Sequence, residues 1–440
     1  MISPTIKISS DNKIIWPVFI LGIFESFLGN KEIMFAVVLA FILLFWAFQR
    51  RIYFNTIIGT KPYFLMIAVM SVMGFLTYHS EIVVRDILYE TAWFAVIILG
   101  TMFYRSYSSK SMLRTISLYL GCVSVYTILF GLREVFARGI EFSAFRSAFE
   151  TNTYSISIVL AIMLANRIYY RKRTFEGPLE NILMLLFAVQ IILNLSRAAM
   201  MNVVLFIAAF AIFYLTRNRK ISVFLFLRNL IVISAAVAAL FVGFMKIIPD
   251  DVKETFLTKY RRTLVEIDDK NEYRDVYSAL KDWRGYEIYS AQKQFKSYDV
   301  IEMVVGRGNG TAISVEYRPD YWGNIFEKQE SGIGIGVLHN TYYTLLIKGG
   351  IIAVVLFIYF LLANVVHFFR KSKYEKLERL SIIMICLFIV YIFEAYVFRS
   401  FFSKDVDFPI MLLMGWLYCE IDDKENTDEE SVEEERIESE

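Results

Sequence analysis

The stretch VLHNTYYTLLIKGGI, residues 337–351, decides how the rest of the chain is arranged. It lies where a long polar segment ends and an apolar run of membrane-spanning length begins. His339 and Asn340 are therefore predicted at the mouth of a transmembrane helix. Glycines at alternate positions over 332–336 precede them, and glycine allows a close backbone approach and a sharp re-entry. Because a histidine at such a boundary can exchange a proton with water, we predict proton chemistry here.

The composition is that of a membrane protein. The 440 residues are 57% hydrophobic, above the proportion typical of soluble domains, and apolar runs of about 20 residues recur along the chain. Cys122, Cys386 and Cys419 have no spacing typical of a disulfide framework or a zinc site. The sequence carries no phosphate-binding glycine loop, nucleotide-binding motif or carboxylate-rich cation loop. An enzyme of this kind is expected to take its energy from an activated substrate.

The predicted fold class is an all-α polytopic integral membrane protein with about twelve transmembrane helices. Because the first apolar run, from Ile14, has no small-residue cleavage site behind it, we predict a retained helix rather than a signal peptide. The predicted spans cover residues 14–29, 33–49, 62–78, 87–104, 115–131, 154–170, 179–195, 198–215, 229–247, 340–364, 380–397 and 406–420.

The connecting loops differ in charge from one side of the predicted bundle to the other. Loops at residues 105–114, 167–173, 217–228 and 370–379 are rich in Lys and Arg, whereas the short loops of the opposite side carry few. Cytoplasmic loops of membrane proteins carry the excess of Lys and Arg. This rule predicts that both termini are cytoplasmic and that residues 248–338 lie outside.

The predicted orientation divides the chain into four parts. We expect the last part to be disordered, because it is acidic and has no apolar periodicity. The parts are transmembrane helices 1–9 in residues 1–247, one large external loop between helices 9 and 10 in 248–338, helices 10–12 in 339–420, and a cytoplasmic tail in 421–440.

The external loop is predicted to contain an amphipathic helix from Tyr273 to about Tyr298, because apolar residues recur there at helical spacing. Arg284 falls on the apolar stripe of that helix. The glycine-rich run 306–310 follows, and we interpret it as a flexible turn.

The strongest candidates for chemistry are Arg197, Arg284 and His339. Arg197 lies between two apolar runs with almost no loop, where a charge is costly and often functional. Guanidinium groups bind phosphate oxygens in a fork, and a histidine can remove a proton from a hydroxyl. Each residue also has a structural interpretation, because arginines reach for headgroups and interfacial histidines make hydrogen bonds.

Weaker candidates for substrate contact lie beside these residues, in the glycine-rich run 306–310 or in the predicted outer loop 132–153. That loop could meet an anionic substrate, although an ordinary solvated loop explains it better. No metal ligand set is predicted. The weaker candidates are Asn340, Ser196, Arg307, Asn152 and Arg146.

Three features together resemble the O-antigen ligase and O-antigen polymerase superfamily of bacterial envelope glycosyltransferases. Ser196-Arg197 between adjacent spans resembles the Ser-Arg turn of the family, and Arg284 stands where the family has a loop arginine. Residues 338–351, with His339-Asn340 and a later glycine pair, resemble its "HN-x-Y…G" approach to the next helix. The helix count and the large loop agree, so the resemblance covers most of the chain. The family's glycine turn normally lacks an arginine, whereas Arg307 interrupts it here, so either Arg307 shares the phosphate-binding role or Arg284 holds it alone.

The resemblance implies a GT-C-like bundle in the bacterial inner membrane that transfers a glycan from an undecaprenyl pyrophosphate-linked oligosaccharide, without metal or cofactor. It implies that His339 is the general base for the acceptor hydroxyl, and that Arg197 and Arg284 bind the pyrophosphate. The implied partners are this lipid-linked donor, membrane lipids and a chain-length regulator protein, with no nucleic acid.

Several functions are compatible with these residues. A polysaccharide polymerase of O-antigen or capsule type is the first hypothesis, and a ligase that moves the glycan to lipid A core or another acceptor is the second. A transporter of lipid-linked oligosaccharides is a hypothesis of another class, although the sequence shows no internal repeat of the kind common in transporters. A structural scaffold would leave the Ser-Arg turn unexplained.

Overall fold

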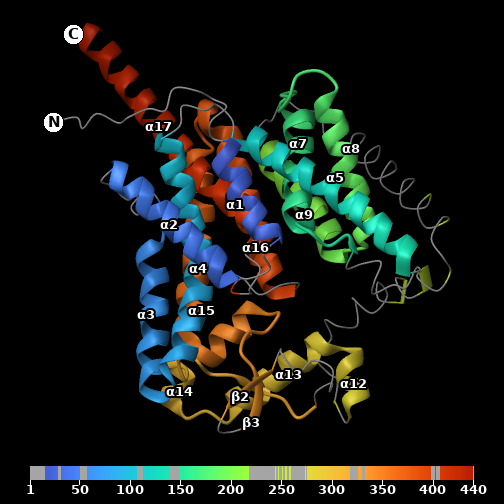
Figure 1. The fold of residues 1–440 in the computed structure, drawn as a ribbon. Helices are drawn as coiled ribbons and strands as arrows, with labels where there is room; N and C mark the ends of the chain where they lie inside the picture. The colour runs from blue at the N-terminus through green and yellow to red at the C-terminus, as the bar shows by residue number, and fades with distance from the viewer. Residues whose placement is uncertain are drawn as a thin grey trace.

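The computed structural model is a bundle of helices with a small mixed module at one end (Figure 1). The residues that it describes are 15–27, 31–49, 57–106, 112–138, 148–217, 275–317, 326–329, 332–397, 402 and 407–439, with isolated residues between 243 and 273.

The helices of the bundle follow the predicted apolar runs closely. Of the twelve predicted spans, the one at 229–247 lies outside the described residues apart from Gly243 and Lys246. The others correspond to α1 (Ile15–Phe27), α2 (Lys31–Gln49), α3 (Thr60–Thr77), α4 (Ser80–Ser106), α5 (Met112–Arg138), α7 (Thr153–Tyr169), α8 (Leu179–Asn194), α9 (Arg197–Arg217), α15 (Thr341–Lys371), α16 (Glu375–Val397) and α17 (Phe408–Ser439).

The described part of the chain has the helices of an all-α membrane protein. Further apolar helices, such as Ile33–Phe48 and Leu179–Asn194, are shorter than a typical span. Five helices are long and apolar enough to cross a bilayer, namely Thr60–Thr77, Met112–Ala137, Arg197–Thr216, Thr341–Lys371 and Glu375–Tyr396.

The module at the end of the bundle combines three short helices with a three-stranded antiparallel sheet of order β1-β3-β2. A separate apolar core, which includes Ala291, Ile335 and Ile347, joins the module to the beginning of α15. The elements are α12 (Val276–Lys281), α13 (Trp283–Lys296), α14 (Val300–Val305), β1 (Ile313–Ser314), β2 (Phe326–Gln329) and β3 (Gly332–Ile335).

Two local predictions for this module need correction. The single helix expected from Tyr273 to Tyr298 is divided into α12 and α13 at Asp282, whose carboxylate caps α13 by accepting from Gly285 N–H. The glycines of 332–336, which we expected to form a sharp hinge, lie mostly in β3. This strand pairs with β1 on one side and β2 on the other, so its backbone hydrogen bonds hold it extended.

The glycine turn of residues 306–310 is buried and fixed rather than flexible. Gly308 N–H donates to Lys348 O (2.7 Å), and Asn309 N–H donates to Met70 O (2.8 Å). Gly306, Gly308 and Gly310 all have positive φ, and a Cβ on Gly308 would collide with the backbone of α3 at Gly74. The turn therefore fastens the module between α3 and α15.

The acidic tail, for which we expected disorder, is helical as the continuation of α17 to Ser439. Basic side chains of neighbouring helices hold its first turns. Arg105 pairs with Asp423 at 2.5 Å, and Lys371 pairs with Glu425. Glutamate is also a good helix former, so the pairing and the propensity act together.

Helices α4 and α17 pack at a glycine contact, which gives a first testable prediction. A Cβ on Gly415 would collide with the carbonyl group of Ile97 on α4. Gly415→Ala should therefore lower the free energy of unfolding by about 1–3 kcal/mol, as for other overpacked cores. Thermal unfolding of the purified protein measures this change.

Gly121→Ala is the matched control for helix propensity, because the Cβ at Gly121 meets only the movable end of the Leu183 side chain. We expect this control to stay near the wild-type stability. Equal effects of the two substitutions would contradict a backbone clash at Gly415.

Candidate functional site

His339 lies at the start of α15, next to a buried carboxylate of the module. Its Nδ1 is 3.0 Å from both Oε1 and Oε2 of Glu287, and its backbone N–H donates to Glu287 Oε2 at 3.0 Å. Glu287 is only 3% exposed, whereas the His339 side chain is 47% exposed. A carboxylate only accepts hydrogen bonds, so Nδ1 carries the proton and Nε2 is the basic nitrogen of the neutral ring.

Glu287 is held in place from α13. Trp283, one turn earlier, donates from Nε1 to Glu287 Oε1 at 2.6 Å. Three N–H groups therefore converge on one buried carboxylate, the arrangement in which charge-assisted hydrogen bonds are strong. We did not predict Glu287 as a site residue. The only signal in the sequence is its place one helical turn after Arg284.

Arg284 lies on the same helix as Glu287, one helical turn earlier. Residues three apart on a helix have Cβ atoms about 5–6 Å from each other, so Arg284 and Glu287 are neighbours on α13. The Arg284 side chain is half-buried. The structure thus brings His339 onto Glu287, and Arg284 lies one helical turn before Glu287 on α13.

Asn340 has a positioning role. Its Oδ1 caps α15 by accepting from Tyr343 N–H (3.1 Å), and its Nδ2 donates to Tyr396 O near the end of α16 (2.9 Å). The side chain is buried at 3% exposure. It orients the backbone of the neighbouring His339.

The predicted tight turn between α8 and α9 is present. Leu195 closes α8 in the left-handed region with φ of 53°, and the buried Ser196 caps α9 by accepting from Ala199 N–H (3.3 Å). Ser196 therefore serves the helix end. Arg197 is the first residue of α9 and half-buried. A cation at a helix N-terminus opposes the helix dipole, so helix stability does not account for Arg197.

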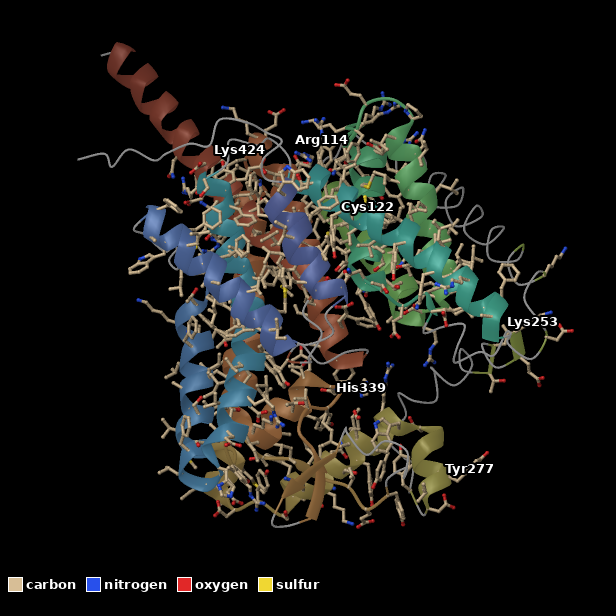
Figure 2. All side chains as sticks on the ribbon, viewed as in Figure 1. Arg114, Cys122, Lys253, Tyr277, His339 and Lys424 are labelled. Carbon is tan, nitrogen blue, oxygen red and sulfur yellow. The ribbon has the colours of Figure 1, made fainter. Side chains whose placement is uncertain are left out.

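The last turns of α16 connect the Ser-Arg turn with His339. Asn202 on α9 donates from Nδ2 to Glu394 Oε1, and Asn340 bonds to Tyr396 two residues further on. Five residues of helix rise only about 7.5 Å, so Arg197 begins α9 close to the level of this contact. Figure 2 shows His339 below the end of α16 and above the module. The Ser-Arg turn and the histidine therefore share one end of the bundle.

Arg307 faces a different part of the module. Its Nε and Nη2 donate to both oxygens of Glu302 (2.9 and 3.2 Å), and its guanidinium lies 4.3 Å from the centre of the Tyr298 ring. The hydrogen bond to Glu302 raises the pKa of Arg307, and burial raises the pKa of Tyr298 to about 12. Arg307 lines a cleft of about 970 Å³ with Tyr286 and Tyr289, apart from the His339–Glu287 pair.

Of the remaining weaker candidates, the structure gives the contacts of Asn152 and does not describe Arg146. Asn152 donates from Nδ2 to Ser26 Oγ (2.8 Å) and to Tyr119 O–H (3.1 Å), which ties the start of α7 to α1 and α5. Arg146 lies outside the described residues. Across the described ranges no group of three His, Cys, Asp or Glu side chains is placed to hold a metal ion.

No protein-family model matches the chain, and no curated protein matches it significantly. The function is therefore argued from the geometry of the site and from the motifs that carry the resemblance.

Proposed function

We propose that the protein is a polysaccharide polymerase of O-antigen or capsule type, a glycosyltransferase that uses an undecaprenyl pyrophosphate-linked donor. The observation that carries the proposal is the exposed His339 ring, oriented by the buried Glu287, with Arg284 on the adjacent turn. A basic ring nitrogen, with a guanidinium one helical turn from the carboxylate that orients the ring, suits transfer from a phosphate ester to a hydroxyl.

In the proposed reaction, His339 Nε2 takes the proton of an acceptor sugar hydroxyl as its oxygen attacks the anomeric carbon of the donor. The new glycosidic bond forms, the bond from that carbon to the pyrophosphate oxygen breaks, and undecaprenyl pyrophosphate leaves. Glu287 keeps the Nδ1 proton in place and stabilises the imidazolium that forms. The donor bond supplies the driving energy, so the proposal needs neither metal nor cofactor.

Arg197 and Arg284 are the proposed ligands of the pyrophosphate. Both are half-buried, and guanidinium groups bind phosphate oxygens in pairs. Arg197 also begins α9, where backbone N–H groups favour an anion. Fixed cations at this position stabilise the charge that develops on the leaving group.

The proposed setting is a bacterial inner membrane, with both termini cytoplasmic and the site on the outer face. The distribution of Lys and Arg among the loops supports this orientation. Twelve spans in a GT-C-like bundle, with residues 248–338 outside, complete the proposal. A chain-length regulator is its proposed protein partner.

A ligase that transfers the glycan to lipid A core remains the alternative, because both reactions use the same donor and the same base. The transporter hypothesis has less support. The polar groups described above gather at one end of the bundle, whereas transporters bind near the midplane of the membrane.

The test uses the full chain in lipid nanodiscs with one undecaprenyl pyrophosphate-linked repeat unit as both donor and acceptor. A ladder of products that differ by one repeat unit is the expected result. A single transfer that requires added lipid A core would replace the polymerase by the ligase. Movement of intact donor across the bilayer without any new glycosidic bond would overturn both.

A further inference from the structure

A second site lies at the end of the bundle opposite to His339. It is a cavity of about 280 Å³ between α5, α7, α16 and α17, closed on one side by the loop after α7. Figure 2 shows Arg114, which lines it, at the far end of the helices from His339. The glycosyl-transfer site makes no use of this cavity.

The charge around the cavity is strongly positive. Among the described side chains that line it, four are basic and one is acidic, namely Arg114, Lys172, Arg173, Arg379 and Glu420. The single carboxylate is shared, because Lys424 donates from Nζ to Glu420 Oε1 at 2.8 Å. The lining therefore carries an excess of positive charge that the side chains within it do not neutralise.

The cavity wall is held in a defined shape. The loop that carries Lys172 and Arg173 folds back, because Lys172 N–H donates to Asn166 O (3.2 Å). Arg114 Nε donates to Thr174 O at 2.5 Å. The buried Glu180 accepts from the backbone N–H groups of Thr174 and Phe175 through Oε2. These bonds fix the loop over the cavity, so its cations converge on one volume.

The inner wall of the cavity is apolar. Leu380 and Ile383 of α16 and Leu413, Trp416 and Leu417 of α17 form it. A cationic rim above an apolar wall matches a phosphate headgroup joined to an acyl chain, and basic pockets between transmembrane helices are known to hold anionic lipids. A soluble anion would use only the rim.

We propose that this cavity binds the phosphate of an anionic phospholipid from the leaflet opposite to the His339 face. Arg379, half-buried and bonded to Asn166 Oδ1 at 3.3 Å, lies at the junction between rim and wall. Guanidinium groups hold phosphate oxygens in a fork, and the two exposed cations of the loop close over the headgroup. The lipid would link α5, α7, α16 and α17 at this end of the bundle. The inference is independent of the proposed glycosyltransferase activity.

The test is native mass spectrometry of the full chain in detergent, titrated with phosphatidylglycerol or phosphatidylcholine. Lys172→Gln combined with Arg173→Gln should weaken phosphatidylglycerol binding by about 30-fold, since each cation near a headgroup contributes roughly a factor of five. Both side chains are exposed, so the double variant should fold. Arg370→Gln with Lys373→Gln is the matched control, because it removes the same charge from exposed residues at the end of α15 and in the turn that follows it, on the same side.

Retention of phosphatidylglycerol by the wild type and the control, with loss in the Lys172/Arg173 variant, supports the proposal. Equal weakening in both double variants would overturn it in favour of diffuse surface attraction. Equal binding of phosphatidylcholine would also overturn it. A third arm adds inorganic phosphate during thermal unfolding, and stabilisation by phosphate equal to that by the lipid would show a free-anion site instead.

Discussion

His339→Ala is expected to lower the rate of glycan transfer by about 10²–10⁴-fold, the usual contribution of a general base, while the amount of protein in the membrane is unchanged. Because the His339 side chain is 47% exposed, its removal leaves little cavity and little loss of packing. The rate is measured in nanodiscs with the lipid-linked repeat unit, and abundance is measured on the same membranes. A parallel fall in activity and abundance would contradict a role in the chemistry.

Glu287→Gln separates the role of the carboxylate from that of the ring. The amide keeps the size of the side chain but loses the charge that holds Nδ1–H, so turnover should fall by about 10²-fold. Because Glu287 acts through His339, the double variant should be no slower than His339→Ala alone. A multiplicative loss would show that Glu287 works independently. Glu302→Gln, which affects the separate pair with Arg307, is the control.

Lys348→Met is expected to lower the free energy of unfolding by about 3–5 kcal/mol, because it removes the nearest cation from the buried carboxylate of Asp86 and leaves only the longer contact with Arg85 at 3.7 Å. Lys348 Nζ lies 2.6 Å from Asp86 Oδ2, and the two side chains are 2% and 3% exposed. Asp86 Oδ2 also accepts from Gly310 N–H at 2.7 Å, so loss of the pair should loosen the glycine turn as well. Thermal or denaturant unfolding of the purified protein measures the change.

Adding Asp86→Asn to Lys348→Met should restore much of the lost stability, since the carboxylate that lost its lysine is then uncharged. Lys293→Met is the matched control, because its pair with Glu316 is exposed and such pairs contribute little. A double variant as unstable as Lys348→Met alone would contradict the account of an uncompensated charge.

The apolar runs of the sequence were sufficient to predict the helices, because a helix satisfies its own backbone hydrogen bonds and needs only a local pattern. The boundary at His339-Asn340 and the tight turn at Ser196-Arg197 were predicted for the same reason. The flexible glycine turn and the glycine hinge were mistaken, because the neighbours that hold 306–310 and β3 come from other parts of the chain.

The sequence by itself determined the helical class, the ends of the helices at the site and the residue types that suit the proposed chemistry. The tertiary structure alone decided which of them meet. Glu287 and His339 are hydrogen-bonded although 52 residues separate them in the sequence, and Asp86 and Lys348 are bonded across 262 residues. Such pairs form only when separate helices pack, so the local pattern of the sequence does not predict them. Burial then makes them strong, because a carboxylate removed from water depends on the donors that the fold brings to it.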